Sequence, residues 1–134
     1  TVTNLLMDQA AFLTDPRFED IPEGSVTQKL RLISELVVRS KVLGFSLCVP
    51  AGFEFEESIP NVLFTISRPR GESKRAACVH DWIYRNGGKL SEGTVTRQQA
   101  DAVYHELLRL KGVSPVRSYF RWFGVRLGGS SSWK

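Results

Sequence analysis

The spacing of apolar residues changes near the middle of the chain. Between residues 26 and 50, apolar and polar side chains alternate, as in Leu30, Arg31 and Leu32 and again over residues 45–49. An alternation with a period of two is typical of strands that bury one face. We therefore predict a small antiparallel β-sheet at about residues 26–50.

Three stretches with helical spacing follow, each with a start and a stop signal. They begin at Ser73, Thr96 and Ser114 and end at the glycines of positions 87–88, 112 and 128–129. Ser and Thr favour helix N-caps because their hydroxyls accept a free backbone N–H, and Gly adopts the left-handed conformation of helix ends. Pro115 suits a first helical position. The fold class expected is therefore α+β, a small antiparallel sheet followed by a three-helix C-terminal half.

The two ends of the chain carry weaker patterns. Residues 1–24 are rich in turn residues and acids, so we expect an N-terminal arm with at most one short helix. We expect a single α+β domain over residues 25–128 and a flexible tail over 129–134. Leu5, Leu6 and Phe12 in the arm and Trp133 in the tail are candidate contacts with other proteins.

An acidic stretch, VPAGFEFEESIP at residues 49–60, has proline near both ends. We expect a loop that leaves the sheet, with Phe53 and Phe55 pointing inward. Repulsion among Glu54, Glu56 and Glu57 must be relieved by solvent, by a cation or by basic residues. We favour the four basic residues at positions 68–75, which follow closely in the sequence.

The first predicted helix, KRAACVHDWIYR at residues 74–85, carries polar groups among small apolar ones. His80 and Tyr84 share one stripe, with Asp81 about 100° round the helix axis. If the first two helices pack antiparallel, Asp101 of the second comes close to His80. Two interpretations stay open. The group is a buried polar tie between helices, or it is catalytic, with His80 as the base and Asp101 fixing its tautomer.

The third helix interleaves Tyr119, Phe120, Trp122 and Phe123 with arginines. We expect most of these aromatic rings to pack in the core. The alternative is a helix face that meets a membrane surface or a nucleic-acid strand.

Charge is distributed unevenly along the chain. Residues 1–67 hold 5 Lys and Arg against 9 Asp and Glu, whereas residues 68–134 hold 13 against 5. This asymmetry fits either two partner surfaces or two ends of one domain that complement each other. Without a lysine-rich run, nucleic-acid contact is not favoured. No apolar run approaches the roughly 20 residues of a transmembrane segment, and Cys48 and Cys78 are too few for a disulfide framework.

Three sequence motifs together resemble a known family. VPAGFEFEESIP (49–60), AACVHDWIY (76–84) and RQQADAVYHELLRLKGVS (97–114) are similar to an uncharacterised domain family common in tailed bacteriophages and prophages. That family reads roughly VPxGFxTDxASIP, then AAxxHDxLY, then a helix with a central aspartate. The likeness covers about residues 49–124. The first motif departs from the pattern, because it is one residue shorter and lacks the Thr-Asp pair, for which Glu56 or Glu57 is the nearest substitute.

The phage resemblance implies a virion component, such as a tail, neck or capsid accessory protein. We expect it to be made in the host cytoplasm, since the first residues lack the pattern of a signal peptide. It would act in several copies through contacts with other virion proteins.

A weaker likeness is to the secreted calcium-dependent phospholipases. In those enzymes a histidine activates water, the next aspartate binds calcium, and an aspartate of an antiparallel helix orients the histidine. His80, Asp81, Tyr84 and Asp101 match that constellation, although the flanking disulfides and the glycine-rich calcium loop are missing. This likeness implies an alternative function, a calcium-dependent hydrolase of lipid or cell-envelope esters. Asp81, Glu56 and Glu57 would be the metal ligands, and we expect no other cofactor.

Overall fold

The computed structural model describes residues 9–21, 28–57 and 73–134. Within these ranges the strands come first: β1 (Ala11–Phe12), β2 (Phe18–Ile21), β3 (Gln28–Leu32), β4 (Leu36–Ser40), β5 (Phe45–Val49) and β6 (Glu54–Glu57). The helices follow: α3 (Lys74–Arg85), α4 (Arg97–Leu110), α5 (Pro115–Gly128) and the short 3-10 helix η1 (Ser130–Ser132). The predicted α+β class is confirmed, with the three helices where their start and stop signals indicated.

The strands form two antiparallel sheets instead of one, and part of the expected arm belongs to both. The strand orders are β1-β4-β5 and β2-β3-β6. Ala11 of β1 pairs with Arg39 of β4, and Phe18 of β2 pairs with Leu32 of β3. The expectation of an arm with at most one short helix is therefore wrong for residues 9–21. Such short strands gain stability only from neighbouring strands, so their own residues carry little signal.

The acidic stretch is also a strand and not a loop over Glu54–Glu57. It pairs with β3, where Leu30 lies opposite Phe55 and Lys29 lies opposite Glu56. Phe55 is fully buried, as its inward orientation predicted, and Phe53 packs edge-on against Trp82 at 5.2 Å between ring centroids. The apolar burial of this strand outweighs the turn signals around it.

The cation beside the acidic strand comes from β3. Arg31 is ion-paired with Glu54 at 3.3 Å and also with Glu19 of β2. Of the basic residues we favoured, those at positions 68 and 70 lie outside the described residues, and Arg75 pairs instead with Asp15 at 2.7 Å. Strand pairing therefore provides Glu54 with a cation that we did not expect, and pairing of the acidic residues with positions 68 and 70 stays a prediction.

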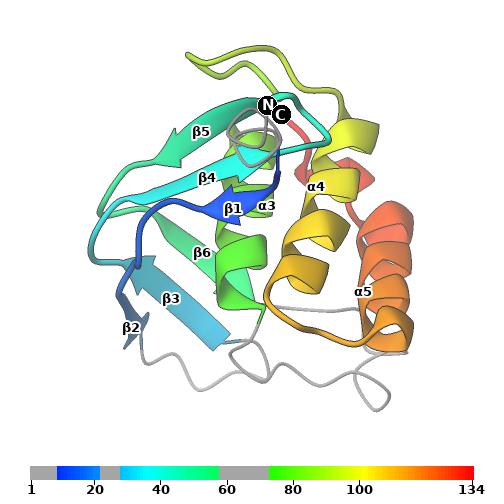
Figure 1. Ribbon diagram of the computed structural model, residues 1–134, viewed down its shortest axis with the longest axis horizontal. Coiled ribbons are helices and arrows are strands. Elements are labelled where there is room, and N and C mark those ends of the chain that lie inside the picture. Colours follow the sequence, from blue (N-terminus) through cyan, green and yellow to red (C-terminus); the bar gives the residue numbers. More distant parts are fainter. Residues whose placement is uncertain (1–8, 22–27, 58–72) are drawn as a thin grey trace.

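α3 is the central helix of the molecule. It packs on β5 and β6 and on α4, and α5 packs against α4. Figure 1 shows this succession from the strands through α3 and α4 to α5. Seven of the twelve residues of α3 are buried, and they include Ala76, Ala77, Cys78 and Val79. Small side chains at these positions let the sheets and α4 approach the helix closely.

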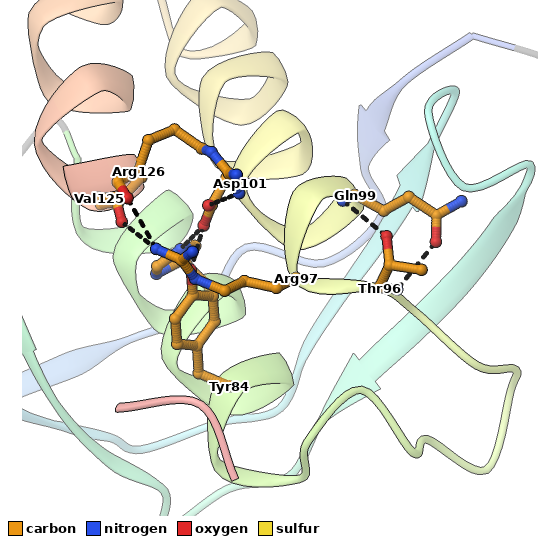
Figure 2. A network of polar contacts seen from close by, with 8 residues as sticks. Tyr84, Thr96, Arg97, Gln99, Asp101, Val125 and Arg126 are labelled. Carbon is orange, nitrogen blue, oxygen red and sulfur yellow. Dashed lines mark hydrogen bonds and ion pairs between the residues drawn. The ribbon is translucent and has the colours of Figure 1, made fainter. Parts of the chain in front are cut away.

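Two of the three predicted N-caps are confirmed in detail. Thr96 and Gln99 form a reciprocal capping box at the start of α4 (Figure 2). The Ser114 hydroxyl accepts the backbone N–H of Arg117 in the first turn of α5. Ser73 lies at the N-cap position of α3 but makes no cap hydrogen bond. Its hydroxyl instead accepts a bond of 2.9 Å from the guanidinium of Arg121, which is fully buried.

The C-terminal tail folds back onto α3. The ring of Trp133 packs edge-on against Tyr84 at 5.1 Å, and the backbone N–H of Lys134 donates to the carbonyl of Tyr84. The tail is therefore not the free linker that we expected. No helix in the described part of the chain is long and apolar enough to cross a membrane.

Candidate functional site: a buried carboxylate and imidazole between three helices

Asp101 of α4 is a fully buried carboxylate whose side-chain partners come from the two other helices, α3 and α5. Its Oδ1 accepts hydrogen bonds from His80 Nε2 at 2.7 Å and from the Tyr84 hydroxyl at 2.5 Å, both on α3. Its Oδ2 accepts a bond of 2.7 Å from Arg126 of α5. A buried charge is stable only when it is paired and hydrogen-bonded, and this carboxylate meets both conditions.

His80 is held in one orientation by the contact with Asp101. An ionised carboxylate only accepts hydrogen bonds, so Nε2 carries the proton of a neutral ring and Nδ1 has the free lone pair. Within the described ranges, no residue makes a hydrogen bond to Nδ1. The imidazole lies against the rings of Tyr84 and Tyr104, at centroid distances of 4.2 and 5.0 Å. About 10% of the His80 side chain remains exposed.

Arg97, the first residue of α4, joins the same group to the end of α5. Its Nε donates to the Tyr84 hydroxyl at 3.0 Å. Its terminal nitrogen donates to the carbonyls of Val125 and Arg126 at 3.2 and 2.8 Å. Figure 2 shows Arg97 and Arg126 meeting beside Tyr84 and Asp101. The carbonyl of Val125 also accepts the backbone N–H of Gly129. The last turn of a helix carries the negative end of its dipole, so a guanidinium there is favourable.

The protonation states of the group follow from these contacts. Burial on its own would raise the pKa of Asp101, but hydrogen bonds from His80, Tyr84 and Arg126 outweigh it and hold the pKa below its usual value. The pKa of Tyr84 is raised by burial and by the neighbouring Asp101 carboxylate. At neutral pH the site therefore holds an ionised aspartate and a protonated tyrosine.

Asp81 is not part of the group around Asp101 and contacts other residues. Its Oδ2 accepts the backbone N–H of Glu56 at 3.3 Å and lies 3.8 Å from the guanidinium of Arg85. Burial raises the pKa of Asp81 above its usual value, which these two contacts only partly offset. The Glu56 side chain is exposed, and the side chain of Glu57 lies outside the described residues. In the described part of the chain, no three His, Cys, Asp or Glu side chains come together as a metal site would require.

The substitution Asp81→Asn tests whether the surrounding residues compensate the negative charge of Asp81. Because burial disfavours the ionised form, Asp81→Asn should leave the free energy of unfolding at pH 7 unchanged or raise it by up to about 1 kcal/mol. The pKa of Asp81 is raised in the folded state, so the free energy of unfolding of the parent decreases as pH rises through that pKa. The stability advantage of Asp81→Asn should therefore vanish at lower pH, where Asp81 is protonated. Urea unfolding at several pH values checks this.

The contradicting result involves calcium. A cation that binds only the folded state must raise the melting midpoint. If millimolar calcium raises the midpoint of the parent and not that of Asp81→Asn, a cation site exists at Asp81. In that case the negative charge of Asp81 serves to bind the metal. The prediction that Asp81→Asn is at least as stable as the parent would then be wrong.

The structure brings together three of the residues singled out from the sequence. His80, Tyr84 and Asp101 form one hydrogen-bonded group, as the antiparallel packing of two helices predicted. Arg97 and Arg126 were missed. A signal for Arg126 was present, because Asp101 lies in an apolar stripe and therefore needs a cation, but the twelve other basic residues at positions 68–134 were equally eligible by sequence.

Two of the four predicted contact residues, Phe12 and Trp133, have partners within the chain. Phe12 lies on β1 with the guanidinium of Arg75 over its ring at 4.9 Å, and Trp133 packs on Tyr84. Leu5 and Leu6 lie outside the described residues. Contact with a partner protein through these four residues stays a prediction.

The fold and the site define a class of small α+β domain, in which three helices enclose an aspartate, a histidine, a tyrosine and two arginines. The chain belongs to the family described as protein of unknown function (DUF1353), which matches residues 30–125. This agrees with the expected membership of an uncharacterised family. Neither a search of curated proteins nor one of solved structures finds a match to the chain.

Proposed function

We propose that this protein is a hydrolase in which His80 acts as the general base on an ester of a lipid or of the cell envelope. One observation carries the proposal. The buried Asp101 carboxylate holds His80 through Nε2 at 2.7 Å, which directs the lone pair of Nδ1 away from the carboxylate. A fixed neutral imidazole with a free nitrogen is the arrangement that general-base catalysis requires.

In this mechanism Nδ1 of His80 takes a proton from a water molecule while the water oxygen bonds to the ester carbonyl carbon. Asp101 stays ionised and stabilises the imidazolium that forms. The tetrahedral intermediate then loses its alcohol group by cleavage of the carbon–oxygen bond, and the alcohol oxygen takes the proton back from Nδ1. Tyr84 and Arg126 act as positioning residues, because they hold Asp101 and do not touch the reacting atoms.

Calcium has no assigned step in this mechanism. The ligands implied by the phospholipase likeness are Asp81, Glu56 and Glu57, and the side chain of Glu57 lies outside the described residues. Among the described side chains, no three His, Cys, Asp or Glu come together. Calcium dependence stays a separate proposal, which the melting experiment on Asp81 tests.

His80→Gln separates catalysis from structure. The glutamine amide can still donate to Asp101, so the folded state should keep most of its stability. It has no basic nitrogen, so the rate of ester hydrolysis should fall by about 10²- to 10⁴-fold. Soluble acyl esters and phospholipid micelles serve as substrates, and His105→Gln is the matched control because His105 is not part of the Asp101 group.

Two outcomes contradict the proposal. The first is a folded parent protein that hydrolyses none of these esters above the uncatalysed rate. The second is hydrolysis that survives in His80→Gln. In either case the contact between His80 and Asp101 is a structural tie between α3 and α4.

A role as a virion component, working by contact with other virion proteins, is the function that we first expected from the phage resemblance, and it stays a proposal. Two of its expected contact residues have partners within the chain, since Phe12 pairs with Val38 and Trp133 packs on Tyr84. Leu5 and Leu6 lie outside the described residues. Location in the virion likewise stays a proposal. Detection of the chain in purified particles by mass spectrometry tests it, and its absence from particles would contradict it.

A further inference from the structure

α5 turns its apolar side chains away from the core. Val116, Tyr119, Phe123 and Leu127, spaced by three or four residues, are 64%, 54%, 40% and 64% exposed. We call these four residues the α5 face. The rings of Tyr119 and Phe123 stack at 6.3 Å between centroids. Single exposed apolar residues are ordinary, but a stripe along a whole helix is typical of an interaction surface.

This arrangement reverses what we expected, since most of the aromatic rings of α5 were predicted to lie in the core. In the described part of the chain, none of its four aromatic residues belongs to the core cluster or packs against it. The buried residues of α5 are Ser118, Arg121 and Gly124. Small and polar side chains, together with Val125, therefore form the inner side of the helix, and the α5 face forms the outer side.

Polar contacts fix α5 in this orientation. Arg121 donates to Ser73 at the start of α3, and Arg126 is ion-paired with Asp101. A rotation that buried the α5 face would break both contacts and leave a buried carboxylate without its cation, at a large cost. The exposure of the α5 face is therefore a property of the fold. In Figure 1, α5 lies at the edge of the helical half, with α4 on its inner side.

The charge around the α5 face indicates what it binds. After Glu106 the sequence contains no Asp or Glu, whereas it contains six basic residues: Arg109, Lys111, Arg117, Arg121, Arg126 and Lys134. Two of them are occupied within the fold, because Arg121 is buried and Arg126 is ion-paired with Asp101. Arg109 and Lys111 are exposed, in the last turn of α4 and in the short connection that leads into α5. A binding partner with negative charge is thus favoured over a neutral or basic one.

We propose that the α5 face binds an anionic lipid surface, with its apolar side chains at the acyl boundary and the exposed Arg109 and Lys111 near the phosphates. A convex helix ridge enters a deformable lipid surface without needing a matching groove. Aromatic and aliphatic side chains beside Lys and Arg are the composition of helices that lie in the plane of a membrane. The proposal is independent of hydrolysis by His80.

Vesicle flotation tests the proposal. The parent should bind phosphatidylglycerol vesicles, bind phosphatidylcholine vesicles at least tenfold more weakly, and lose anionic binding as salt rises. The double variant Tyr119→Gln with Phe123→Gln should weaken anionic binding at least tenfold with an unchanged melting midpoint, because neither ring packs on the core. The matched control is Leu13→Gln with Val42→Gln, two exposed apolar residues outside α5, which should bind like the parent.

Three results would overturn the inference. They are no binding to either vesicle, equal loss of binding in both double variants, and a dimer in sedimentation velocity that the α5 variant abolishes. The last would mean that a second copy of the chain covers the α5 face. His80→Gln should bind vesicles like the parent, so failure of vesicle binding and failure of ester hydrolysis are separate results.

Discussion

Asp101→Ala should lower the free energy of unfolding by about 3 kcal/mol or more, since it leaves buried partners of a charge uncompensated. Three side chains lose their shared acceptor: His80, Tyr84 and Arg126. Arg126 is about one-third exposed and can relax toward water, which keeps the expected loss at the lower end of the range for broken buried ion pairs. Urea unfolding at pH 7 measures the difference.

Asp15→Ala is the matched control. Asp15 also pairs with an arginine at 2.7 Å, but its side chain is almost fully exposed. Exposed ion pairs contribute little, so this variant should lose less than about 1 kcal/mol. If Asp101→Ala costs no more than Asp15→Ala, the group around Asp101 does not hold the three helices together.

A second test is the pH dependence of the difference in free energy of unfolding between the parent and Asp101→Ala. The pKa of Asp101 is lower in the folded state than its usual value, so its carboxylate stabilises the fold above the unfolded pKa of about 4. That contribution is lost as pH falls through the folded-state pKa. The difference between the parent and Asp101→Ala should therefore be constant near neutrality and shrink in acid. A difference that grows in acid would contradict the assigned ionisation.

The helices could be predicted from the sequence because their signals are local. Thr96 and Gln99 lie three residues apart and cap each other, and Gly112 ends α4 within its own turn. The pairing of His80 with Asp101 was also predictable, because two consecutive helices joined by a short connection usually pack side by side. In these cases the structure is determined by residues that are close in the sequence, or by the packing of two helices that follow each other in the chain.

The sheets could not be predicted in the same way, since strand pairing depends on distant partners. β1 has two residues, and its place is set by β4, whose Arg39 lies opposite Ala11. The cation beside Glu54 is Arg31, which lies on the neighbouring strand 23 positions earlier in the chain. The orientation of α5 was mispredicted for a related reason. Aromatic residues usually mark a core face, but here the buried bonds of Arg121 and Arg126 determine which side turns inward.

Gly88→Ala should be the other strongly destabilising substitution, because it acts where α3 is connected to the segment that leads into α4. Gly88 has a φ of +76°, and its carbonyl accepts the backbone N–H of Val95 at 2.8 Å. A Cβ at this position would lie 1.8 Å from the carbonyl oxygen of Val95 and 2.9 Å from the ring of Trp133. The backbone must therefore move for alanine to fit, and Val95 directly precedes the capping box that begins α4.

Gly44→Ala is the control that separates the strain of a left-handed backbone from the steric clash at Gly88. Gly44 has nearly the same φ, +79°, but a Cβ there meets nothing within 4 Å. Its substitution should cost only the strain of a left-handed conformation, about 1–2 kcal/mol. Gly88→Ala adds the displacement of packed backbone, so it should cost at least about 2 kcal/mol more. Because the displaced segment positions Arg97 and Asp101, His80-dependent hydrolysis should also fall. Equal urea midpoints for the two variants would mean that the contact between Gly88 and Val95 is loose enough to admit a side chain, and that the start of α4 does not depend on it.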